Sequence, residues 1–350
     1  MICGLKVLLL QNFELWVMNY LDLISVIVCT YNQQDTIRRT LDSILAQKCH
    51  LPIEIVIGED CSTDDTLAIC KEYEKQYPDR IHILANNPNK GLVRNYFDCI
   101  CACRGKYIAD CAGDDFWIDD TKLEQSSLIL DKNVNVGIVH TDWLKFDEKT
   151  GKLQPSSDSP KEKILKVLPR GRMEGDTLMP GQRPAIHLCT SLYRNEWVRR
   201  AMTDYPQFFD PNIYLCEDMQ IAFFMAHRGD VAYIDKPTLA YSCGKHTVSN
   251  PDSEEKQFLF WANVTRLSYD LANTFHVSDE RLSKFFQARI HKLLMHAFRS
   301  GKTSLRSEAI HIQQEMGVSN NRQICLAKIL MFPGIWQLMR FLRNFIKNTK

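Results

Sequence analysis

Two adjacent carboxylates, Asp114 and Asp115, follow a short apolar run at residues 107–109. The run is typical of a buried strand, and Gly113 is the kind of residue that ends a strand in a turn. Carboxylate oxygens are the ligands that hard divalent cations prefer, and phosphate oxygens of a substrate often complete the coordination. We therefore expect this segment to bind Mg²⁺ or Mn²⁺ together with a phosphate-bearing ligand.

The surrounding elements alternate between strands and helices. Apolar, β-branched runs predict strands, and apolar residues spaced by three and four predict helices. We expect strands at 23–30, 53–58, 81–84, 107–109 and 136–140. We expect an amphipathic helix that carries Ile37, Leu41, Ile44 and Leu45 and ends before Pro52, and further helices at 62–77, 91–103 and 122–130. This alternation predicts an α/β fold with a mostly parallel sheet flanked by helices. Ligands bind at the carboxyl ends of such strands, which is where Thr30, Asp60 and Asp114 lie.

The pattern changes at residues 147–184, where Gly, Pro, Lys and Ser are frequent and periodicity is weak. We interpret this stretch as a long, mobile loop beside the site. Further elements are expected at 185–193, 195–202, 217–227 and 231–234, followed by helices beyond 255. The expected organisation is a poorly defined segment at 1–22, an α/β domain at 23–250 and a helical, basic extension at 251–350.

The composition is ordinary for a globular protein, with 45% hydrophobic residues, 24% charged residues and a formal net charge of +1. The charge is uneven, since residues 281–350 carry thirteen Lys and Arg residues against two acidic ones. A basic segment on an acidic body favours either an anionic partner, such as a membrane surface, or docking of the segment onto its own acidic domain. We expect no nucleic-acid partner.

The thirteen cysteines form no recognisable disulfide framework. Free thiols in a reducing compartment explain them best, so we expect a cytoplasmic protein. No run of about eighteen apolar residues occurs, and a transmembrane helix is therefore not expected. Peripheral attachment to the inner face of a membrane stays open.

Three blocks of sequence together resemble the family 2 inverting glycosyltransferases of the bacterial surface-polysaccharide type. These blocks read SVIVCTYNQQDTIRRTLDSILAQ, IEIVIGEDCSTDDT and GLVRNYF…GKYIADCAGDDFW. The resemblance covers residues 23–142 and continues more weakly to about 250 through CEDMQIAFFMAHRG and GKHTVS. It implies a GT-A, Rossmann-like domain with a helical C-terminal extension. It also implies transfer of a sugar, with inversion, from a nucleotide diphosphate-sugar such as a UDP-sugar to a saccharide or lipid-linked saccharide acceptor.

A nucleotide-sugar donor needs a pocket that recognises its base and ribose. Asp60 could accept the imino N–H of uracil in a charge-assisted hydrogen bond. The resemblance places Thr30, Tyr31 and Asn32 beside the base and ribose. It also adds Asp64, although Asp60 and Asp64 could equally cap the following helix.

The same resemblance places three further residues beside the nucleotide. Arg94 and Asn95 open a helix after a G-x-x-R-N arrangement, and Arg94 could contact phosphate or stay solvated. Gly113 precedes the two carboxylates of the cation segment.

A bound cation would neutralise the diphosphate leaving group. Family members carry an acidic residue, one spacer and then Asp, whereas this sequence has Ala112 at the first position. Asp114 matches the main metal contact of the family, and Asp115 or Asp110 could compensate for the missing acid. Strand alternation would turn neighbouring side chains to opposite faces, and helix capping by Asp114 and Asp115 is the structural alternative. His246 resembles a late histidine that closes over the diphosphate or metal.

An inverting displacement needs a base on the face opposite the leaving group. Glu217 and Asp218 match the Glu-Asp motif of the family, in which the Asp is the base. Both acids would also suit a helix N-terminus for dipole reasons alone.

The chain end at residues 335–350 has basic residues on one helical face and apolar residues on another, as in an interfacial helix on anionic lipid. Packing of this helix on the α/β domain is the alternative. Two rival functions are a metal-dependent nucleotidyltransferase and a catalytically impaired nucleotide-sugar-binding protein. The first should have a glycine-rich loop near residues 33–39, which contain no glycine, and the second is suggested by Ala112.

Overall fold

The computed structural model describes residues 20–156, 166–180, 185–243, 253–332, 334, 335 and 337–339. The chain divides into two compact units, Met1–Cys243 and Gly244–Lys350.

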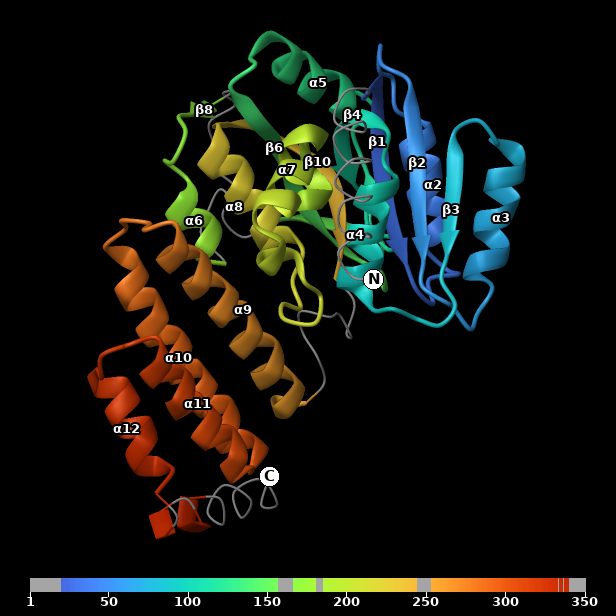
Figure 1. The fold of residues 1–350 in the computed structure, drawn as a ribbon. Coiled ribbons are helices and arrows are strands. Elements are labelled where there is room, and N and C mark those ends of the chain that lie inside the picture. The colour runs from blue at the N-terminus through green and yellow to red at the C-terminus, as the bar shows by residue number, and fades with distance from the viewer. Residues whose placement is uncertain are drawn as a thin grey trace, which may run out of the picture. The chain divides into compact units, whose positions relative to one another are not determined.

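The first unit is built on one ten-stranded sheet with the order β3-β2-β1-β4-β9-β6-β10-β5, to which β7 and β8 pair at β6 and β10 (Figure 1). Its strands are β1 (Leu21–Thr30), β2 (Ile53–Glu59), β3 (Ile81–Ala85), β4 (Gly105–Asp110), β5 (Phe116–Trp117), β6 (Val136–Asp147), β7 (Lys152–Pro155), β8 (Lys166–Leu168), β9 (Leu192–Arg194) and β10 (Asp230–Ser242). Strands β3, β2, β1 and β4 are mutually parallel, as are β6 and β10. Because β9 is antiparallel to both β4 and β6, all six of these strands run in one direction. The predicted mostly parallel α/β sheet is confirmed.

Helices cover this sheet and complete its core. They are α2 (Ile37–Leu45), α3 (Thr66–Gln76), α4 (Leu92–Ala102), α5 (Lys122–Lys132), α6 (Glu174–Leu178), α7 (Asn195–Asp204) and α8 (Asp218–Arg228), with the 3₁₀ turns Leu188–Thr190 and Pro206–Phe209. In α2 the apolar residues Ile37, Leu41 and Ile44 are fully buried, as their spacing predicts. They join a continuous cluster that includes Ile24 of β1 and Ile55 of β2.

The prediction of a long loop at 147–184 is wrong for parts of this segment. Its described parts contain β7, which forms a hairpin with β6 across the turn at Gly151, and β8, which pairs with β10. Both strands lie largely exposed, so their sequences lack the apolar alternation that identifies a strand. Strand β10 also extends eight residues past the predicted end at 234, because its register shifts at Pro237 and pairing then resumes.

The second unit is helical. It contains α9 (Glu254–Thr274), α10 (Arg281–Ser300), α11 (Thr303–Glu315) and α12 (Arg322–Leu330). These helices bury their own cluster, which includes Phe258, Leu293, Ile312 and Ile324. The predicted helical C-terminal region is confirmed. Among the residues that the structure describes, no helix is both long and apolar enough to span a membrane.

Candidate functional site

The carboxyl ends of β1, β2 and β4 bring predicted residues to one edge of the sheet. Thr30 is the last residue of β1, and its carbonyl accepts the amide of Asp60 at 3.0 Å. The loop after β4 folds back over the same edge, because the Gly113 amide donates to the Cys29 carbonyl at 3.1 Å. Parallel strands thus place residues about 30 and 80 positions apart in one site.

Buried polar atoms without hydrogen-bond partners line this edge. The Thr30 hydroxyl and the Gln33 Oε1 atom are both of this kind. A Cβ atom at Gly113 would lie 2.3 Å from Gln33 Oε1 and 2.8 Å from Thr30 Oγ1, so only glycine fits there. Buried polar groups normally have partners, and exceptions need an explanation. A polar ligand that enters beside Gly113 would supply the missing partners.

The loops after β1 and β2 are tied together by two predicted residues. Asn32, which has a positive φ of 53°, accepts the Thr63 amide on its side-chain oxygen at 2.8 Å. The Asp64 carboxylate accepts the Gln34 amide of the other loop at 3.2 Å and the Thr66 amide of its own loop at 3.0 Å. Although burial opposes it, this bonding lowers the pKa of Asp64. Tyr31 between these ties is 48% exposed and leaves its ring open to solvent.

The Asp60 carboxylate is 4% exposed and already accepts three hydrogen bonds. Its Oδ1 receives the Asn86 amide group at 3.0 Å and the Lys90 backbone amide at 2.8 Å, and its Oδ2 receives the Gly91 amide at 2.9 Å. Only one lone pair, on Oδ2, is therefore left to accept a hydrogen bond from a nucleotide base. In this structure Asp60 holds the loop between β3 and α4.

Asn95 also serves this loop. The side chain is 1% exposed, donates to the Gly58 carbonyl at 2.8 Å and accepts from Asn86 at 2.8 Å. Both polar atoms of its amide are thereby used within the protein. The neighbouring Arg94 is exposed, so Arg94 is the member of this pair that can reach a ligand.

The two carboxylates that follow β4 differ in environment. Asp115 is 1% exposed and accepts the Ser242 amide at 2.8 Å, which joins its loop to the end of β10. Burial and the neighbouring Asp114 raise the pKa of Asp115 well above its usual range. Asp114 is only partly buried, and burial together with Glu148 raises its pKa as well. Asp114 is thus the more accessible carboxylate of the two.

Arg39 of α2 contacts the loop that carries Asp114. Its guanidinium donates to the Asp114 carbonyl at 2.9 Å and pairs with Glu148 at 2.7 Å. It also lies 4.3 Å from the ring centroid of Phe116 and 4.8 Å from that of Phe146. We did not predict this residue, because nothing in the sequence separates Arg39 from the adjacent Arg38.

Glu217 and Asp218 lie at the start of α8. Asp218 is exposed, and its Oδ1 accepts a hydrogen bond from the Cys216 thiol at 3.1 Å. Burial, and then the charges of Asp218 and Asp110, raise the pKa of Glu217 to about 8. Asp110 is the last residue of β4, so one of the charges that raise this pKa comes from the sheet. The pKa of Cys29, next to last in β1, is raised chiefly by its hydrogen bond with Cys99 and by burial, and the charge of Glu217 adds to the effect.

A buried polar cluster lies beneath this edge. The Tyr96 hydroxyl donates to Asp110 Oδ1 at 2.5 Å and lies 2.8 Å from the Tyr193 hydroxyl. Burial raises the pKa of Asp110 to about 7 and lowers that of the fully enclosed Lys122 to about 8. The Asp110 Oδ2 atom has no hydrogen-bond partner. Tyr96, Lys122 and Tyr193 were not predicted, since each lies within an ordinary apolar or amphipathic run.

One predicted site residue, His246, falls at 244–250 and lies outside the described residues. Most of the predicted interfacial helix at 335–350 also lies outside them. The metal, nucleotide and base assignments made from the sequence remain predictions.

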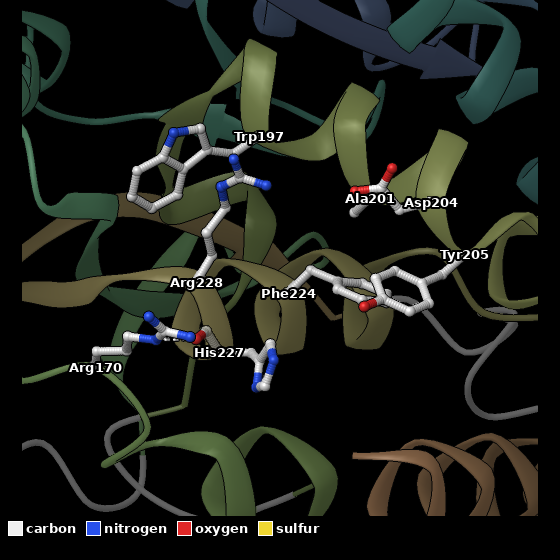
Figure 2. A pocket seen from close by; sticks show the side chains of 8 residues that line it. All are labelled: Arg170, Trp197, Ala201, Asp204, Tyr205, Phe224, His227 and Arg228. Atoms are coloured by element: carbon white, nitrogen blue, oxygen red, sulfur yellow. Dashed lines mark hydrogen bonds between the residues drawn. The ribbon is translucent and has the colours of Figure 1, made fainter.

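A cavity of about 400 Å³ lies elsewhere in the first unit (Figure 2). Figure 2 shows the Tyr205 ring beside that of Phe224, and their centroids are 5.3 Å apart. The Arg228 guanidinium lies 5.5 Å from the Trp197 ring centroid. Arg228, which lines the cavity, is the last residue of α8, and Asp218 is the first. Since eleven helical residues span about 16 Å, the cavity lies about one helix length from Asp218. None of the catalytic, nucleotide-binding or metal-binding residues predicted from the sequence lines this cavity.

The family model described as glycosyl transferase family 2 matches residues 25–201 of this chain. The putative glycosyltransferase EpsE of Bacillus subtilis is 35% identical over 39% of this chain and 50% of its own length. A protein of Escherichia coli named UDP-Glc:alpha-D-GlcNAc-diphosphoundecaprenol beta-1,3-glucosyltransferase WfaP is 37% identical over 28% of this chain and 38% of its own length. The chain thus spans half or less of these curated relatives.

The fold is similar to that of S. aureus TarS, whose residues 1–349 were solved in complex with UDP-GlcNAc. The TM-score is 0.57 and the identity 18%, over 85% of this chain and 82% of that one. This likeness confirms the predicted GT-A fold. The family match covers just over half of the chain and confirms the predicted family. The chain belongs to glycosyl transferase family 2.

Proposed function

We propose that this chain transfers a sugar, with inversion, from a UDP-sugar to a saccharide or lipid-linked saccharide acceptor in cell-surface polysaccharide synthesis. The observation that carries the proposal is the convergence at one sheet edge of unpartnered polar atoms, an accessible carboxylate and a second acidic pair. The names of relatives support the substrate classes: WfaP is named for UDP-Glc and a diphosphoundecaprenol-linked sugar, and TuaG for teichuronic acid biosynthesis.

The donor would lie across the loops that follow β1, β2 and β4. Tyr31 offers an exposed ring for stacking on the base, and Thr30 and Gln33 offer buried polar atoms beside Gly113. Asp60 acts chiefly by fixing the loop between β3 and α4, with one Oδ2 lone pair left for an N–H of the base. Arg94 in the first turn of α4 is exposed and would contact phosphate.

The residues after β4 fit a hard divalent cation. Their ligand atoms are oxygens. Burial raises the pKa values of Asp114 and Asp115, the charge of Glu148 adds to the effect at Asp114 and that of Asp114 adds to it at Asp115, and a bound cation would favour the charged form of both. Asp114 would hold Mg²⁺ or Mn²⁺, because Asp115 is almost inaccessible. One carboxylate plus phosphate oxygens and water is a common arrangement for Mg²⁺. When bound, the cation would stabilise the charge of the departing diphosphate.

Asp218 would act as the base. The acceptor oxygen forms a bond to the anomeric carbon, the bond from that carbon to the diphosphate oxygen breaks, and the acceptor proton moves to the Asp218 carboxylate. Since the pKa of Glu217 is about 8, Glu217 holds its own proton at neutral pH. This favours Asp218 over Glu217 as the proton acceptor.

Peripheral attachment to an anionic membrane on its cytoplasmic side is part of the proposal. The exposed apolar side chains near the end of the second unit support this part of the proposal. Four large ones are 50–63% exposed, namely Leu326, Ile329, Phe332 and Leu338. Basic residues follow in the sequence at 340, 343 and 347. An apolar stripe beside basic residues is typical of helices at anionic lipid surfaces.

The direct test is a donor screen that measures release of nucleoside diphosphate with and without Mn²⁺. The proposal expects UDP release from at least one UDP-sugar, stimulated by an acceptor fraction that contains lipid-linked saccharide. Binding of UDP without release from any donor would contradict catalysis and favour the nucleotide-sugar-binding protein that Ala112 suggests. Release from GDP- or dTDP-sugars alone would contradict the choice of UDP.

A further inference from the structure

A cluster of three potential metal ligands lies far from the proposed donor site. Cys49 and His50 belong to the loop between α2 and β2, and Glu124 lies in the first turn of α5. One ligand atom from each residue lies within 4.8 Å of the other two. Strand β2 begins just after this loop and carries Asp60 at its other end, about 20 Å away. The cluster is therefore separate from the carboxylates after β4.

The imidazole of His50 is held between two carboxylates. Its Nδ1 lies 2.6 Å from Glu124 Oε2, and its Nε2 lies 3.5 Å from Asp131 Oδ2. The backbone amide of His50 also donates to Glu124 Oε2, at 2.9 Å. A carboxylate on the outer nitrogen is the usual partner of a metal-bound histidine, because it fixes the tautomer and the ring orientation. Asp131 occupies that outer position.

The thiol of Cys49 completes the cluster. Its Sγ lies 3.8 Å from the Ser127 hydroxyl, and burial raises its pKa, so without a metal it is a neutral thiol. The His50 and Glu124 side chains are 42% and 32% exposed, which leaves an open approach for an ion.

We propose that Cys49, His50 and Glu124 bind Zn²⁺, with water as the fourth ligand. Sulfur, imidazole nitrogen and carboxylate oxygen together suit Zn²⁺, whereas Mg²⁺ requires oxygen ligands. Binding forms bonds from the metal to Sγ, Nδ1 and a carboxylate oxygen. It releases the thiol proton to solvent, and the neutral imidazole carries its one ring proton on Nε2, which faces Asp131. The bound ion links the loop before β2 to α5 and thereby stabilises the α/β unit.

Cobalt(II) provides the test, because a cobalt–thiolate bond gives a near-ultraviolet charge-transfer band and tetrahedral coordination gives visible bands. The full chain, reduced and freed of metal by chelation, is titrated with Co²⁺ and then with Zn²⁺. The proposal expects both sets of bands with one equivalent of Co²⁺ and their loss when Zn²⁺ is added. No charge-transfer band in the wild-type protein, or one that Cys49→Ser retains, would overturn it.

Matched variants assign the bands to this cluster. Cys325→Ser removes an exposed thiol of the second unit and should leave the spectrum unchanged. Asp114→Asn should also leave it unchanged, which separates this site from the proposed donor cation. His50→Gln should abolish the visible bands, and their persistence would count against the proposal even if Cys49→Ser fails to fold. Zn²⁺ should raise the melting temperature of the wild-type protein and of Cys325→Ser but not of His50→Gln.

Discussion

At the scale of single residues, the acids at the strand ends differ in how much of their bonding capacity the protein already uses. Asp60 accepts three hydrogen bonds, Asp64 accepts the backbone amide of Gln34, and Asp115 accepts that of Ser242. Asp114 and Asp218 remain more accessible. An acid that the fold has already satisfied positions a loop, whereas an accessible acid can meet a ligand.

This division was only partly predictable. Strand alternation anticipates that Asp114 and Asp115 face different surroundings. The saturation of Asp60 depends on Asn86 and on the Lys90 amide, which lie 26 and 30 residues away in a loop. No local pattern encodes contacts of that range. The capping role that the sequence left open for Asp64 agrees with its bond to the Thr66 amide.

Glu217 gives a pH prediction. Its pKa is raised from 4.5 to about 8 in the folded protein. Between these values the unfolded chain loses a proton that the folded chain keeps, so Glu217 makes the free energy of unfolding fall as pH rises from about 4.5 to 8. Glu217→Gln should remove this loss and stabilise the protein at pH 8 by about 1–2 kcal/mol. Urea denaturation at pH 5 and pH 8 measures the effect.

Glu174→Gln is the comparison variant, because Glu174 is an acid paired with His227 away from the sheet edge. It should lower stability at both pH values or leave it unchanged. An equal pH dependence in Glu217→Gln and wild type would contradict the raised pKa.

At the scale of elements, the strands and helices nearest the site were predicted best. Helix α2 carries the predicted apolar residues from Ile37 to Leu45 and ends before Pro52 as predicted, and β1 and β2 lie within two residues of prediction. These elements are buried on the sheet, so hydrophobic periodicity identifies them. The two-residue β5 and the short β8 were missed because both pair with the distant β10, and β7 was missed because it is short and exposed along its length.

The Arg39 contacts predict how the cation loop is held in place. Arg39→Gln removes a bond to the Asp114 carbonyl, an ion pair and two ring contacts, and it should cost about 1–3 kcal/mol of unfolding free energy. It should also weaken Mn²⁺-dependent UDP binding, since the loop loses its support.

The adjacent Arg38 provides the control. It pairs with Glu72 on the surface, where both side chains are more than half exposed. Arg38→Gln should therefore leave both stability and UDP binding nearly unchanged. Equal effects of the two substitutions, measured by denaturation and calorimetry, would refute the role given to Arg39.

At the scale of the whole molecule, an α/β unit that carries the candidate site is joined to a helical unit with its own core. The uneven charge of the sequence follows this division, because the basic excess lies within the second unit. The boundaries predicted at 22 and 250 remain predictions. The sequence predicted the helical region, but it could not show which apolar side chains of these helices pack in the core and which are exposed to solvent.

The membrane proposal is tested at this scale. Deleting residues 332–350 removes four basic residues and the apolar side chains Phe332 and Leu338. Each basic residue near an anionic surface is worth about 1 kcal/mol, so affinity for phosphatidylserine vesicles should fall at least about 100-fold. Neutral phosphatidylcholine vesicles serve as the control. Unchanged sedimentation with anionic vesicles after the deletion would contradict the proposal.

The central claim is that Asp114 and Asp218 serve one site in different steps, and paired measurements of UDP binding and UDP release test it most directly. Asp218→Asn should bind UDP with Mn²⁺ as the wild-type protein does but lower turnover by about 10²–10⁴-fold. Asp114→Asn should lose the Mn²⁺-dependent part of binding. Asp204→Asn, an exposed acid paired with Arg200, should behave as wild type. Wild-type release by Asp218→Asn, or unaltered Mn²⁺ dependence in Asp114→Asn, would contradict the account.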